Sequence, residues 1–156
     1  MTRRLLAALV LTAALLTVVA APAQSQPSVT PRCSAVAHLS PSNEVRVPPA
    51  PVDSQAFGIA VVRIEGTTLD FDVTIVNLAR ETFVAGHIHN AVAGVNGPIV
   101  VHLFDGPPTD PIVFVQHDSV EISAEAAAAI CGNLAGYYVN YHTTVEQAGA
   151  TRGQLG

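Results

Sequence analysis

Residues 56–78 read AFGIAVVRIEGTTLDFDVTIVNL and carry the pattern of a β-hairpin. Two runs rich in β-branched residues flank the short stretch from Glu65 to Thr67, whose central glycine suits a tight turn. The second run alternates polar residues with the apolar Leu69, Phe71, Val73 and Ile75. This alternation predicts a strand with one face in a hydrophobic core and the other in water.

Further strand-like runs lie downstream of the hairpin, with turn residues between them. They read TFVAGHIH at 82–89, PIVVHLF at 98–104, IVFVQ at 112–116, SVEI at 119–122 and GYYVNYHTT at 136–144. The Asn96-Gly97 pair is typical of a tight connection between two strands. Upstream, residues 41–55 contain too many prolines for a central strand. Short strands with frequent turns predict a mainly β chain, an antiparallel sandwich or barrel.

One short helix is expected among these strands, near residues 124–131. Ser123 is a favourable N-cap, Glu125 lies in the first turn, and Gly132 follows as a stop signal.

The N-terminus predicts export. Residues 1–23 are expected to be a signal peptide, with Arg3 and Arg4 ahead of an apolar run and then the small-residue cleavage pattern Ala21-Pro22-Ala23. An uncleaved membrane anchor is the open alternative, and no other stretch of the chain is apolar for long enough to span a bilayer. Residues 24–36, polar and proline-bearing over 24–32, are expected to form a linker before a domain at 37–156.

Charge and cysteine content narrow the function classes. The chain has a net charge of −5, which becomes −5 − 2 = −7 when the leader with its two arginines is removed. Nucleic-acid binding needs a basic patch, so the sequence argues against a nucleic-acid partner. The only two cysteines are Cys33 and Cys131. In an oxidising compartment they are expected to pair, with two free thiols as the open alternative.

Four motifs in order carry a resemblance to a known family. They are LSPSNEVRVPP at 39–49, AGHIHNAVAGVNGPIVVHLF at 85–104, GYYVNYHT at 136–143 and RGQL at 152–155. Together they resemble the CHRD domain, the module repeated in chordin and found singly in secreted bacterial proteins. The motif residues include Asn43, Glu44, Asn96, Gly97, Asn140 and Arg152.

The resemblance implies an immunoglobulin-like antiparallel β-sandwich and a secreted binding or interaction module without catalytic activity of its own. Its partner would be an extracellular protein or surface ligand. The chain departs from the family pattern at Ala150, where an acidic residue usually stands two before the arginine.

The histidines of the second motif suggest an alternative function. In an extended segment His87 and His89 point to the same side, and His142 of the third motif offers a third imidazole. These three residues are candidate ligands for Cu or Zn in an extracytoplasmic metal-binding protein. His102 is a further candidate ligand that lies outside the motif.

A purely structural role for the histidines stays open. His87 and His89 would then donate to backbone carbonyls of the glycine-rich bend, while Asn140 and His142 tie the last strand to it.

A metalloenzyme reading rests on weaker signals. The HxH strand is similar to the copper ligands of copper/zinc superoxide dismutases, but the remaining ligands of that family cannot be mapped onto this chain. Arg152 corresponds to the active-site arginine of that family only in its position near the C-terminus. A different role is also open, because Glu44 would pair with Arg152 if the first and last strands are neighbours.

Overall fold

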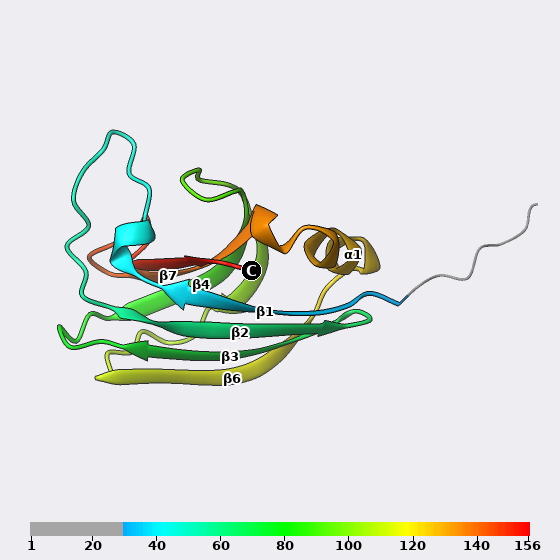
Figure 1. Ribbon diagram of the computed structural model, residues 1–156. Helices are drawn as coiled ribbons and strands as arrows, with labels where there is room; N and C mark the ends of the chain where they lie inside the picture. Colours follow the sequence, from blue (N-terminus) through cyan, green and yellow to red (C-terminus); the bar gives the residue numbers. More distant parts are fainter. Residues whose placement is uncertain (1–29) are drawn as a thin grey trace, which may run out of the picture.

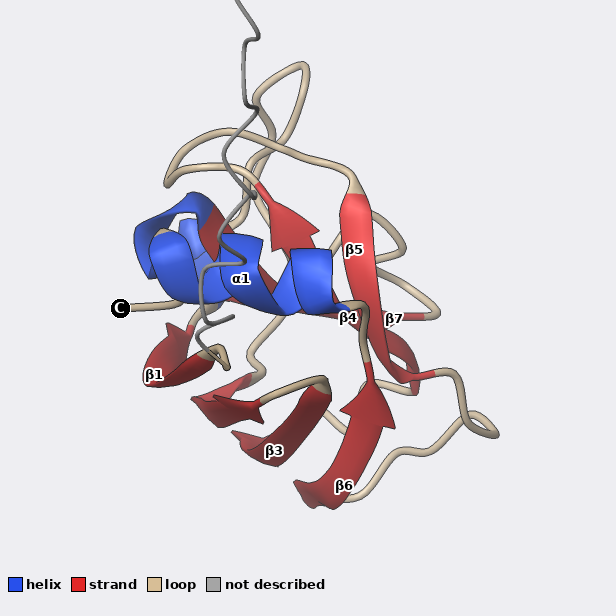
Figure 2. Ribbon diagram, turned by 90° about the vertical axis from the view of Figure 1, so that its right-hand side faces the viewer, coloured by secondary structure: helices blue, strands red, loops and turns tan. Residues whose placement is uncertain are grey.

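The computed structural model describes residues 30–156, and the predicted signal peptide lies outside this range. The described residues form two four-stranded antiparallel sheets that face each other, with one α-helix, α1 (Figures 1 and 2). The first sheet has the order β1 (Arg32–Leu39), β2 (Phe57–Glu65), β3 (Thr68–Val76) and β6 (Val113–Glu121). The second has the order β5 (Ile99–Phe104), β4 (Phe83–Asn90), β7 (Tyr137–Thr143) and β8 (Thr151–Gln154). The predicted antiparallel β-sandwich is confirmed.

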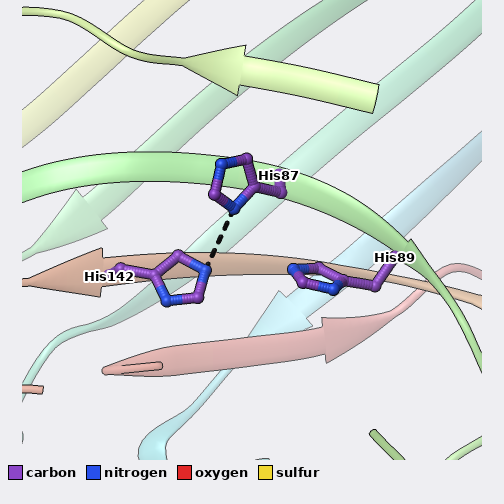
Figure 3. Close-up of side chains that lie close together, drawn as sticks. All are labelled: His87, His89 and His142. Carbon is purple, nitrogen blue, oxygen red and sulfur yellow. Dashed lines mark hydrogen bonds between the residues drawn. The ribbon is translucent and has the colours of Figure 1, made fainter. Parts of the chain in front are cut away.

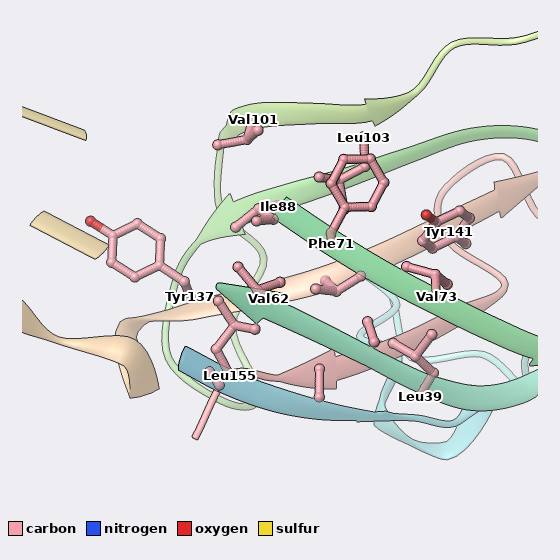
Figure 4. Close-up of a cluster of buried hydrophobic side chains, with 14 of the residues drawn as sticks. Leu39, Val62, Phe71, Val73, Ile88, Val101, Leu103, Tyr137, Tyr141 and Leu155 are labelled. Atoms are coloured by element: carbon pink, nitrogen blue, oxygen red, sulfur yellow. The ribbon is translucent and has the colours of Figure 1, made fainter. Parts of the chain in front are cut away.

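The hairpin at 56–78 forms as its pattern predicts. Glu65, the last residue of β2, pairs with Thr68, the first residue of β3, and Gly66 turns the chain between them with a φ of 66°. All four alternating apolar residues of β3 are buried. Their side chains meet those of the second sheet, among them Ile88 and Tyr141, in one continuous core (Figure 4).

One side of the sandwich is closed by contact between its first and last strands. Just beyond the end of β1, Ser40 forms an antiparallel bridge with Arg152 of β8, with N···O distances of 3.0 and 3.3 Å. At Gly153 a Cβ atom would lie 2.6 Å from the carbonyl oxygen of His38. The glycine of the RGQL motif is therefore needed for the close approach of the two strands.

Helix α1 (Ala124–Gly132) lies at one end of the two sheets and is tied to β1 (Figure 2). The Ser123 hydroxyl accepts a hydrogen bond from the Ala126 backbone N–H at 3.0 Å, so the predicted N-cap is confirmed. Cys33 of β1 and Cys131 of the helix form a disulfide, as expected. Within residues 30–156, no helix combines the length and the apolar character needed to cross a membrane.

The structure corrects two predicted boundaries. The first strand begins at Arg32, so residues 32–36 of the expected linker belong to the sheet, where they pair with β2. The expected strands at 112–116 and 119–122 are one strand, β6, because His117 and Asp118 continue the pairing with β3. Both residues are exposed: His117 lies on the outer face, and Asp118 lies on the core-facing side of β6, which is the edge strand of its sheet.

The structure also corrects the predicted turn. The tight turn between β4 and β5 lies at Gly94, where φ is 80°, and not at Asn96-Gly97. Gly97 is needed for a different reason, since a Cβ there would lie 1.9 Å from the carbonyl oxygen of Asn90.

Candidate metal centre

The outer face of the second sheet carries a layer of polar side chains that are largely buried. Strand alternation places them opposite the core residues of β4, β7 and β8. They are His87, His89, Tyr138, Asn140, His142 and Arg152. Two loops, at 44–55 and 91–98, meet over this layer, where the Asn96 side chain donates to the carbonyl of Val45 at 3.0 Å. The motifs of the sequence therefore converge on one face.

Three histidines converge at the centre of this layer (Figure 3). His87 Nδ1 lies 3.1 Å from His142 Nε2, and one ligand atom from each of the three rings lies within 4.8 Å of the others. His87 and His89 are buried on β4, with 7% and 8% of their surface exposed, while Ile88 between them points into the core. The predicted same-side placement of His87 and His89 is found.

Hydrogen bonds to backbone carbonyls orient two of the rings. His89 Nδ1 lies 2.9 Å from the oxygen of Gly97, and His142 Nδ1 lies 3.0 Å from that of Gln147. Because a carbonyl only accepts, each Nδ1 carries the proton in the neutral ring. Each Nε2 therefore carries a lone pair: that of His142 accepts the hydrogen bond from His87 Nδ1, and that of His89 is buried without any hydrogen-bond partner.

The rings are held in the form that binds metals. Burial, together with the neighbouring histidines, lowers the pKa of His87 to about 4. Burial also lowers the pKa values of His89 and His142. All three imidazoles are therefore neutral at neutral pH, and a neutral imidazole offers a lone pair to a metal ion.

The structural alternative is found in part. The predicted bond from His89 to a carbonyl of the bend exists, but His87 faces His142 instead of a carbonyl. His142 is tied to Gln147 in the connection between β7 and β8. A hydrogen-bonded network alone leaves His89 Nε2 unsatisfied.

Two residues beside the cluster extend it beyond the predicted ligands. His102 of β5 is the register partner of His87, and its Nδ1 lies 2.8 Å from Asp105 Oδ2. His87 Nε2 lies 3.8 Å from Asp105 Oδ1. His102 was a candidate in the sequence, while Asp105 lies in a turn-rich stretch that carries no ligand pattern.

Arg152 holds the loop at 91–98 against the sheet. Its guanidinium donates to Asn96 Oδ1 at 3.2 Å and to the carbonyl oxygens of Val92 and Val95 at 3.3 and 2.8 Å. The ring of Tyr138 separates it from the histidines. Arg152 therefore anchors a loop. It does not face the histidines, as an arginine that acts at a bound metal would.

The expected pair between Glu44 and Arg152 does not form. Among the ion pairs of residues 30–156, Arg46 binds Glu146 instead, and its Nη2 also donates to the carbonyl of Gly149 at 2.8 Å. Glu44 Oε1 is buried without a partner, and burial raises the pKa of Glu44 to about 7. The strands are neighbours as supposed, but the Arg152 guanidinium is engaged by the loop at 91–98.

Asn43 connects the first motif to the last. Its side-chain amide donates to the carbonyl of Arg152 at 3.0 Å and, more weakly, to that of His38 at 3.3 Å. The motif residues thus join segments that are far apart in the sequence.

Fold and site together define a disulfide-linked antiparallel β-sandwich with a buried histidine cluster on the outer face of one sheet. A family model described as the CHRD domain matches residues 35–155. The chain belongs to the CHRD domain family. Comparisons with curated proteins and with solved structures give no match.

Proposed function

We propose that this chain is an extracytoplasmic metal-binding protein that holds Cu(II) or Zn(II) on His87, His89 and His142. The observation that carries the proposal is the convergence of three imidazoles with ligand atoms within 4.8 Å of one another. They come from two paired strands, β4 and β7, whose backbones are fixed by the sheet. Rigid strands hold ligands in place better than loops do.

The spacing of the nitrogens suits a tetrahedral ion. Zinc–nitrogen bonds of about 2.0–2.1 Å put neighbouring ligand atoms roughly 3.3 Å apart. His87 Nδ1 and His142 Nε2 are already 3.1 Å apart. The ion would replace the proton between these two nitrogens, which would move to His87 Nε2 or to solvent, and the His89 ring would move toward the ion by a small rotation.

The surroundings of the rings support a ligand role. Metal-binding histidines usually donate their second ring N–H to a carbonyl or carboxylate, as His89 and His142 do. A buried polar atom without a partner costs about 1–3 kcal/mol, and a metal ion would satisfy the one on His89 Nε2.

The ligand set favours particular metals. Imidazole nitrogen is a good ligand for Cu(II) and Zn(II), and Cu(II) forms the more stable complexes in the first-row series. Three protein ligands leave a coordination position for water or another donor.

Two features support an extracytoplasmic location. The Cys33–Cys131 disulfide is consistent with an oxidising environment. The expected signal peptide at 1–23 predicts secretion, and a mature chain without a membrane span follows from its cleavage.

The test is a titration of the purified metal-free chain with Cu(II) and with Zn(II) near neutral pH. We expect binding with a Kd of about 1 μM or tighter. A His89→Ala/His142→Ala variant should bind about 100-fold more weakly. The control is His38→Ala, an exposed histidine of β1 outside the cluster. Failure of the wild type to bind either metal, or equal binding by the double variant, would sink the proposal.

Family membership favours a second candidate, a secreted interaction module without catalytic activity of its own. In that case the polar layer would serve only to fix the two loops that cover it, and the partner would be an extracellular protein or surface ligand. The same titration separates the two functions. Superoxide dismutase activity would be assayed only with protein that has bound copper.

A further inference from the structure

The two ring nitrogens of His87 face two different groups of ligand side chains. Nδ1 faces His142, and Nε2 lies on the side of Asp105, 3.8 Å from its Oδ1. His102 stands against the same ring, with 4.8 Å between the centroids and 81° between the planes. One ligand atom from each of His87, His102 and Asp105 lies within 4.8 Å of the others.

We propose that His87 bridges two divalent transition-metal ions, the second held by His102 and Asp105. This inference rests on the proposed function, because the first ion is the one on His87, His89 and His142. An imidazole binds one metal through each nitrogen once its N–H proton has left. The two ions would then be about 6 Å apart, with two metal–nitrogen bonds and the ring between them.

The chemistry of the second group fits a divalent ion of the same kind. Two imidazole nitrogens and one carboxylate form a ligand set common for zinc. In the metal-free protein the His102 ring and Asp105 share a hydrogen bond of 2.8 Å. A metal on His102 Nδ1 would replace the proton of that bond, which moves to Nε2 or to solvent. The His87 proton goes to solvent as the bridge forms.

Charge also favours a second ion at this place. The bridging ring and the Asp105 carboxylate would each bring one negative charge toward the pair of ions. This lowers the electrostatic cost of placing two divalent cations close together.

The two positions differ in access to solvent. The first lies between His87 and His89, which are buried. At the second, the side chains of His102 and Asp105 are 61% and 60% exposed. The second ion would therefore keep open positions for water or a small anion and would exchange more readily than the first.

The test uses Cu(II) alone as the probe. We expect the wild type to bind two equivalents and to show an electron paramagnetic resonance signal well below that of two isolated Cu(II) ions, because a bridging imidazolate couples their spins. His102→Ala and Asp105→Asn should each bind one equivalent with the full signal of one ion. Both residues are exposed, so circular dichroism should show an unchanged fold.

A matched control lies elsewhere in the chain. His117 and Asp72 form another exposed His–Asp pair on the outer face of the first sheet, without a buried histidine beside it. His117→Ala should leave the two equivalents and the weakened signal unchanged.

The outcomes separate this inference from the proposed function. If the wild type binds one equivalent of Cu(II), and the His89→Ala/His142→Ala variant does not bind it, the bridge is overturned and the proposed function stands. Two equivalents with the full signal of two isolated ions also overturn the bridge. Absence of Cu(II) binding overturns the bridge, and absence of both Cu(II) and Zn(II) binding overturns the proposed function as well.

Discussion

The guanidinium carbon of Arg152 lies 3.3 Å from the centroid of the Tyr138 ring. The same ring stacks on His89, with 4.8 Å between centroids and 5° between planes. Because β7 lies between β4 and β8, the tyrosine stands between the arginine and the histidine. The RGQL motif is thereby linked through a single side chain to the histidine motif.

Replacing Arg152 with Lys should destabilise the chain by about 2–4 kcal/mol. Lysine keeps the charge but lacks the planar group that stacks on Tyr138 and donates to three oxygens of the loop at 91–98. The measurement is the free energy of unfolding in urea. Arg63→Lys is the matched control, because this arginine is 54% exposed in a surface ion pair and should change stability by less than about 1 kcal/mol. Equal effects of the two substitutions would contradict the role given to Arg152.

The disulfide should contribute strongly to stability. It closes a separation of 98 residues, and the loop-entropy model gives about 4.7 kcal/mol for such a length. Cys33→Ala should therefore lower the melting temperature of the oxidised chain, and reductant should lower that of the wild type but not of the variant. An equal wild-type melting temperature with and without reductant would show that the bond adds little.

The strands were largely predictable because their signal is local. Alternation in residues 68–76 identifies β3 without reference to any other part of the chain, and the same local pattern places His87 and His89 on one side of β4. The disulfide was likewise predictable, because the chain has only two cysteines and an oxidising compartment favours their pairing.

The contacts across strands were not predictable from such patterns. β-Bulges between Gly86 and His87 and between Ile88 and His89 set how β4 meets β5, and thus bring His102 beside His87. A bulge leaves no mark in simple alternation. The partner of Glu44 was missed for a related reason, since the loop at 91–98 takes up the guanidinium of Arg152.

Gly153→Ala tests the contact that closes the sandwich. A Cβ there would come within 2.6 Å of the His38 carbonyl oxygen, so β1 and β8 would have to separate. We expect a loss of about 1–3 kcal/mol in the free energy of unfolding. Gly132→Ala at the end of α1 is the control, because no atom lies within 4 Å of its added Cβ and alanine favours the helix. A loss at Gly153 no larger than at Gly132 would mean that the two strands are not in close contact.

Glu44 should make the stability of the chain depend on pH. Burial raises its pKa to about 7 from an ordinary value of 4.5, with Arg46 and Arg152 opposing the shift. The folded state thus binds this proton more tightly than the unfolded state. Its contribution is greatest below about pH 4.5 and is lost as the pH rises to about 7.

Glu44→Gln isolates this effect, because glutamine keeps the shape of the side chain without a titrating proton. Between pH 5 and pH 8 the wild type should lose about 2 kcal/mol relative to the variant, allowing for partial exposure. The buried histidines act in the opposite direction, since their lowered pKa values remove stability as the pH falls below about 6.5. Both proteins carry these histidines, so their contribution cancels in the difference between the two urea unfolding curves. A difference that stays constant with pH would show that Glu44 is ionised at its ordinary pKa.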